Sequence, residues 1–243
     1  SAAISACGKG LQVGFALRLL EEVQQVRLAP NVITYNATLS ALEKRGRSED
    51  AMRMLQQMQR QRVAPDVISF STAISACGRS IQWQHAIELL AAMRRAGTSP
   101  NVVGYTAAVY ACDQGSAWAR SLTVLAAMTA ARVPPNAITL HSAISACHSG
   151  ASWVPALGLL AAMRQRRHQP NAVDCTLVLA ACDAAMQSWR IAGLFQVLQR
   201  DALSWALQRG AAADANSGAA DLSEAAFHAS LAVEALRARG ALG

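Results

Sequence analysis

Five prolines, each followed by Asn or Asp, recur every 35 residues along the chain. They are Pro30-Asn31, Pro65-Asp66, Pro100-Asn101, Pro135-Asn136 and Pro170-Asn171. Other residue types keep the same spacing, namely Met58, Met93, Met128 and Met163, and Trp83, Trp118 and Trp153. A fixed period of 20–50 residues is typical of stacked structural repeats. The sequence therefore predicts an array of similar units rather than one irregular globular core.

Residues 67–101 show what one unit contains. Phe70, Ala73, Ile74 and Cys77 follow the i, i+3, i+4, i+7 spacing of an amphipathic helix. We expect the first helix to begin at an N-cap at Ser69, or at the matching Thr34, Gly104, Thr139 and Asp174. We expect it to end near Gly78. A second apolar stripe then runs to the turn before Pro100, and the Met and Trp positions are interpreted as core.

The predicted fold class is all-α, a right-handed α-solenoid of stacked helix-turn-helix repeats with a period of 35 residues. One such unit cannot cover its own apolar stripes, so stacking is required for stability. The expected divisions are a partial first repeat (1–31), repeats at 32–66, 67–101, 102–136 and 137–171, a degenerate repeat (172–206), and a linker with a C-terminal capping helix (207–243).

We expect no disulfide bonds among the six cysteines. Cys77, Cys112, Cys147 and Cys182 are 35 residues apart, so each occupies the same level of its own repeat, with neighbours a helix-packing distance of about 10 Å away. A disulfide needs Cα atoms within about 7 Å. We expect buried, reduced thiols.

The formal charge is +7, from 22 basic and 15 acidic residues, which is compatible with a polyanionic partner. The sequence contains no apolar run long enough to span a membrane. It also lacks the motifs of nucleotide-binding loops, zinc sites and hydrolase nucleophiles. We therefore expect a protein that is not an enzyme, binds no metal or cofactor, and does not enter a membrane.

The repeat resembles the pentatricopeptide repeat. The resemblance rests on the run Val32-Ile33-Thr34-Tyr35-Asn36, the apolar positions from Ala51 to Met58 and the closing Pro65-Asp66. It extends over about residues 1–206 and is best over 32–171. Because the first unit is truncated and the last is degenerate, we interpret the chain as a fragment of a longer protein. The resemblance implies binding of single-stranded RNA, with one base recognised per repeat.

The resemblance further implies that two side chains in each repeat recognise one base. The expected pairs are Ser1 with Asn31, Asn36 with Asp66, Ser71 with Asn101, Thr106 with Asn136, and His141 with Asn171. The implied preference is A-U-A-A-N, with His141 outside the usual code. The alternative is that Pro-Asn only forms a turn, and that the residues six after each proline are solvated helix positions.

Two further sets are implied. Side chains that wedge between bases are expected at Ile33, Ile68, Val103, Ile138 and Val173, although ordinary packing at a helix start is an equal alternative. Lys9, Lys44 and Arg79 follow the first helices and are expected to contact phosphates. The arginines before each proline are better explained by the negative end of a helix dipole.

The function expected from this resemblance is sequence-specific binding of single-stranded RNA, in organellar RNA processing, editing, stability or translation. The expected compartment is the mitochondrion or chloroplast. The alternative is a protein-binding α-solenoid scaffold, in which the same groove takes a peptide or a partner helix. Protein partners or an effector domain beyond the C-terminus are also compatible with the sequence.

Overall fold

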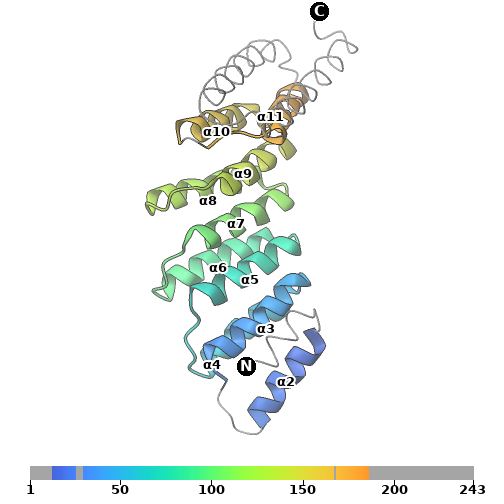
Figure 1. Cartoon of the computed structure of the whole chain (residues 1–243), viewed down its shortest axis with the longest axis vertical. Helices are drawn as coiled ribbons and strands as arrows, with labels where there is room; N and C mark the ends of the chain where they lie inside the picture. The colour runs from blue at the N-terminus through green and yellow to red at the C-terminus, as the bar shows by residue number, and fades with distance from the viewer. Residues whose placement is uncertain (1–12, 26–29, 167, 186–243) are drawn as a thin grey trace, which may run out of the picture. The chain divides into compact units, whose positions relative to one another are not determined.

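A computed structural model of the chain describes residues 13–25, 30–166 and 168–185, and all the regular structure in these ranges is helical (Figure 1). The helices are α2 (Val13–Gln25), α3 (Val32–Lys44), α4 (Ser48–Arg60), α5 (Val67–Arg79), α6 (Trp83–Arg95), α7 (Val102–Gln114), α8 (Trp118–Ala130), α9 (Ala137–Ser149), α10 (Trp153–Gln165) and α11 (Ala172–Ala184). The predicted all-α fold of helical pairs is confirmed. Most of the predicted last repeat and all of the capping helix lie outside the described residues.

The helices alternate between two kinds, each recurring every 35 residues. The A helices (α3, α5, α7, α9 and α11) each start two residues after one of the five prolines that recur every 35 residues. The B helices are the second helices of the repeats (α2, α4, α6, α8 and α10), and the turn that leads from an A helix to a B helix is called the A–B turn. The chain divides into two compact units, residues 1–146 and 147–243. In the first unit α5 packs between α3 and α7, and α3, α5 and α7 each pack on the B helix of their own repeat. In the second unit α10 packs on α11.

The A helices are capped by the residue after proline, so the predicted caps at Ser69 and its equivalents are wrong by three positions. Asp66 has extended backbone (φ −97°, ψ −178°), and its side chain accepts from the Ser69 N–H. Asn31, Asn101 and Asn171 act in the same way at α3, α7 and α11. Ser69 is already the third helical residue, and its hydroxyl accepts from the Asp66 N–H at 3.3 Å. The pair forms a capping box, in which the two residues satisfy each other's backbone donors.

Left-handed backbone marks the turns at both ends of a repeat. Between A and B helices it occurs at Gly46, Ile81, Ser116 and Ala151, and after B helices at Arg62, Gly97 and Arg132. Helix α5 ends at Arg79, one residue after Gly78, which confirms the predicted helix end near Gly78. A β-carbon at Gly78 would be 3.0 Å from Cδ1 of Tyr110 in α7, so this glycine permits close approach of the two A helices.

The methionine and cysteine columns are core, as predicted. Met58, Met93, Met128 and Met163 are buried. Cys77, Cys112, Cys147 and Cys182 are buried, Cys175 is half-buried, and none of these five forms a disulfide. Burial raises the pKa of the thiols of Cys77, Cys112 and Cys147 to about 11. Trp83, Trp118 and Trp153 are only half-buried, because each starts a B helix at the edge of the core. None of the helices in the described ranges has the length and apolarity to cross a membrane.

Candidate nucleic-acid interface

The first turns of the A helices bring together the predicted base-reading residues and the predicted wedge residues. The cap precedes the helix, the proposed wedge is the second helical residue, and the other base-reading residue is the fifth. The wedge side chains are exposed instead of packed: Ile33 68%, Ile68 60%, Val103 60%, Ile138 66% and Val173 54%. This exposure argues against ordinary packing at a helix start, and insertion of these side chains between bases stays a prediction.

Asn36 and Asp66 form a direct pair in the first unit. The Asn36 Nδ2 donates to Asp66 Oδ1 and Oδ2 at 3.1 and 3.2 Å. The hydroxyl of Ser69 donates to Asn36 Oδ1 at 2.6 Å and lies 2.9 Å from Asp66 Oδ1. Partial burial raises the pKa of Asp66, but hydrogen bonds from Ser69, Asn36 and the Ile68 backbone outweigh it and hold the pKa below its ordinary value. The carboxylate is therefore an acceptor at neutral pH.

Ser71 and Asn101 line one hollow of about 290 Å³, together with the wedge residues Ile68 and Val103. The Ser71 hydroxyl is buried and has no hydrogen-bond partner among the described residues. Asn101 Oδ1 accepts from the Gly104 N–H at 3.0 Å, which leaves its amide nitrogen for another acceptor. An apolar hollow with an unsatisfied hydroxyl and an available amide suits a flat ligand with polar edges.

Thr106 and Asn136 are connected through a third residue. The hydroxyls of Thr106 and Thr139 are 2.6 Å apart, and the Thr139 hydroxyl donates to Asn136 Oδ1 at 2.8 Å. Asn136 also accepts from the Thr139 N–H at 2.8 Å. Ser69 and Thr139 occupy the same third helical position, so this position orders the base-reading pair in both repeats.

For each of the remaining two predicted pairs, the structure describes the members only singly. Ser1 lies outside the described residues, while its expected partner Asn31 caps α3 with a bond of 3.0 Å from the Thr34 N–H. His141 belongs to the first unit and Asn171 to the second, where it forms a capping box with Asp174.

The predicted phosphate contacts have different surroundings. Lys9 lies outside the described residues, and Lys44 is exposed at the end of α3. Arg79 Nε is 2.8 Å from Glu43 Oε1, which also accepts from the Ser75 hydroxyl at 3.0 Å. Sequence reasoning missed Glu43, because nothing in the repeat pattern marks it, and missed Ser69 and Thr139 as positioning residues because they were interpreted as caps. In the described ranges no cluster of His, Cys, Asp and Glu could hold a metal ion.

Family comparisons match most of the repeats in the first unit. A model described as the PPR repeat family matches residues 30–79, one described as the pentatricopeptide repeat domain matches 88–149, and one described as the PPR repeat matches 68–98. No curated protein matches the chain as a sequence relative.

Two solved structures show the same fold. The PPR domain of Arabidopsis thaliana protein-only RNase P 1, in complex with tRNA, is 17% identical with a TM-score of 0.64, over 75% of this chain and 96% of that one. PPR10, a maize protein, in complex with an 18-nt psaJ RNA element, is 21% identical with a TM-score of 0.65, over 99% of this chain. The chain spans 33% of the PPR10 chain.

Proposed function

We propose that the chain, whose residues 30–149 match models of the pentatricopeptide repeat, binds single-stranded RNA along the first turns of its A helices, one base per repeat. The observation that carries the proposal is the row of exposed aliphatic side chains at Ile33, Ile68, Val103 and Ile138, each beside a polar cap. Apolar side chains exposed at one position of every repeat offer contacts to the flat faces of unstacked bases, and the polar pairs beside them can bond the base edges.

Recognition in this proposal differs from repeat to repeat. Asn36 offers both a donor and an acceptor, and Asp66 offers only acceptors, which suits the alternating groups on the edge of uracil. In the next repeat, the Ser71 hydroxyl and the Asn101 amide would gain partners from a base in the hollow. The proposal keeps the preference A-U-A-A-N that the resemblance implies, in which the fifth base is left open at His141; the features above bear on its second and third bases.

The wider roles follow from the same proposal. PPR10 and protein-only RNase P 1 were crystallised with RNA, and this chain shares their fold at low identity. We propose a binding role without catalysis in the described repeats, and a function in organellar RNA processing, editing, stability or translation. A protein-binding scaffold is the alternative, since exposed aliphatic side chains also suit a peptide.

Fluorescence anisotropy with a labelled single strand containing A-U-A-A, a scrambled strand and a duplex tests this proposal. At two salt concentrations, the matched strand should bind best. Asn36→Ser should weaken binding of that strand roughly tenfold and favour a purine at the second base, because a good base contact contributes about 1–3 kcal/mol of discrimination. Thr123→Ala, an exposed change on α8, is the control and should leave affinity unchanged.

Equal binding of all three nucleic acids, with only a salt slope, would show nonspecific charge attraction and refute base reading. If none of them bound, the protein-scaffold alternative would take its place.

A further inference from the structure

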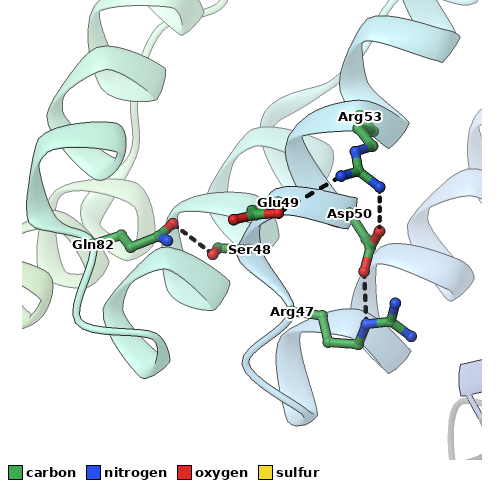
Figure 2. Close-up of polar contacts among 6 residues, drawn as sticks. All are labelled: Arg47, Ser48, Glu49, Asp50, Arg53 and Gln82. Atoms are coloured by element: carbon green, nitrogen blue, oxygen red, sulfur yellow. Dashed lines mark hydrogen bonds and ion pairs between the residues drawn. The ribbon is translucent and has the colours of Figure 1, made fainter.

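Charged residues in the first unit are distributed unequally between the two ends of the repeats. The ion pairs lie at the ends where an A helix leads into a B helix. Arg47 and Arg53 both pair with Asp50 at 2.6 and 3.3 Å, as Figure 2 shows, and Arg79 pairs with Glu43 at 2.8 Å. Three arginines near this end, Arg47, Arg53 and Arg79, are therefore paired with neighbouring carboxylates.

The opposite end, where a B helix leads into the next A helix, carries exposed arginines without such partners. Arg60 and Arg95 are the last residues of α4 and α6, and Arg62 and Arg132 lie in the turns that follow α4 and α8. Across the described part of the chain, none of these four takes part in an ion pair. Interaction with a helix dipole accounts for a cation in the last turn, as at Arg60 and Arg95, but it weakens beyond that turn.

Arg62 and Arg132 adopt the left-handed backbone conformation, which is unfavourable for residues other than glycine. Both have φ of 57°, and the equivalent residue of the intervening repeat is Gly97, with φ of 73°. A side chain in left-handed backbone is strained, whereas glycine adopts this conformation freely. The backbone bond that closes the turn forms in all three cases, at 3.1 Å for Arg62, 3.0 Å for Gly97 and 2.9 Å for Arg132. The turn itself therefore does not need arginine.

These arginines are close in the chain to the base-reading residues. Arg62 is four residues before the cap Asp66, and Arg132 is four residues before the cap Asn136. Both turns lead directly into the first turns of α5 and α9, where the exposed Ile68 and Ile138 stand. An RNA strand whose bases contact the first turns of α5 and α9 would have its phosphates beside the B–A turns that hold these arginines. The arginine guanidinium is suited to phosphate because its planar fork can donate two hydrogen bonds.

We propose that Arg62 and Arg132, together with Arg60 and Arg95, form a row that contacts the phosphates of the bound RNA independently of sequence. This inference rests on the proposed function and adds a second source of affinity at the B–A turns, separate from Lys44 and Arg79. The row contributes affinity and salt dependence, and the caps and fifth residues contribute base preference.

The test is the double variant Arg62→Gly/Arg132→Gly, titrated with the matched and scrambled strands across a salt series. Because glycine suits the left-handed turn, its Tm should be equal to or higher than that of the parent. Affinity for both strands should fall roughly fivefold per arginine at 0.1 M salt, and the slope of log K against log salt should decrease by about 1.4, at ~0.7 per phosphate contact. Ser116→Gly is the matched control, since it changes a left-handed residue (φ 52°) at an A–B turn without removing charge, and should bind like the parent.

The reverse change, Gly97→Arg, adds the missing member of the row where a β-carbon meets nothing within 4 Å. It should strengthen binding and steepen the salt slope, a gain that misfolding cannot imitate. Unchanged affinity in both the double variant and Gly97→Arg would overturn the proposal. Failure of base reading shows separately, as equal binding of matched and scrambled strands by the parent protein.

Discussion

Two successive junctions between repeats in the first unit join the same kinds of helix but have different chemistry. Where repeat 32–66 meets repeat 67–101, the Ser48 hydroxyl donates to Gln82 Oε1 at 2.7 Å (Figure 2), and Arg79 pairs with Glu43. We call this the polar junction. Where repeat 67–101 meets repeat 102–136, Trp83 lies against Gly115, and Tyr110 lies against Gly78. We call this the apolar junction.

Ser48 and Trp83 occupy the same position, the first residue of a B helix, in consecutive repeats. A tryptophan there requires space on the next repeat, and Gly115 provides it, since a β-carbon at that glycine would be 2.3 Å from Trp83 Cδ1. In the polar junction the matching position is Ser80, whose hydroxyl bonds back to its own helix at Ala76 O. The 35-residue period therefore determines which helix positions meet at a junction, whereas the side chains at those positions differ from one junction to the next.

The base-reading pairs differ in the same way. Next to the polar junction, Asn36, Ser69 and Asp66 form a complete hydrogen-bond network. Next to the apolar junction, Gly104 replaces the hydroxyl of Ser69, and Ser71 is left without a partner. One missing side chain at the third helical position thus changes a closed polar network into an open one.

The largest expected effect is on the apolar junction. Gly115→Ala should lower the free energy of unfolding by about 1–3 kcal/mol, because the new methyl group would overlap the Trp83 ring and force it to move. Urea denaturation measures the change. Gly14→Ala, where a β-carbon meets nothing within 4 Å, is the control and should cause no loss of stability. An equal loss in both variants would show that Trp83 is not packed as described.

A smaller effect is expected on the polar junction. Ser48→Ala should cost about 1 kcal/mol, because it removes one hydrogen bond to Gln82 and leaves that amide oxygen without its partner. A double-mutant cycle with Gln82→Ala isolates the interaction and should give a coupling free energy of similar size. Strict additivity of the two substitutions would contradict a role for this bond in holding the two repeats together.

The smallest effect at neutral pH is expected for Asp66→Asn, because Asn and Asp are similarly good caps. The pKa of Asp66 in the folded protein is depressed below its ordinary value of 3.8. The stability that the ionised carboxylate contributes is therefore complete above pH 3.8, and it is lost as the pH falls through the depressed pKa of the folded protein. The difference in stability between parent and variant should therefore shrink in acid. Thermal unfolding between pH 7 and 2.5 measures it, and a constant difference would contradict the hydrogen-bond network described for Asp66.

The period, the helical pairs and the methionine and cysteine columns could be predicted from the sequence, because each follows from apolar spacing at one fixed interval. The caps could not be placed correctly, since Ser69 and Asp66 are both good capping residues and only backbone geometry separates them. The helix end near Gly78 could be predicted, but the contact of this glycine with Tyr110 could not, because a glycine near a helix end suits both a turn and a close helix contact.

The site was predictable in its residue positions but not in their surroundings. Equal spacing located the exposed wedges and the paired polar side chains. It did not show that Asn36 bonds Asp66 directly while Thr106 reaches Asn136 through Thr139. Nor did it show that Glu43 accepts from Arg79, because Glu43, 36 positions earlier in the chain, belongs to no repeated pattern.

The cysteine column has a consequence for how opening of the array can be followed. Cys77, Cys112, Cys147 and Cys182 each sit in the core of a different repeat, with no disulfide partner. Only the thiolate is reactive, and burial covers each of these thiols while its repeat stays closed. Burial also raises the pKa of the Cys77, Cys112 and Cys147 thiols to about 11. Stacked repeats open locally and with different free energies. Each of these thiols therefore becomes accessible to a thiol-modifying reagent only when its own repeat unfolds, so the rate of its modification reports the opening of that repeat.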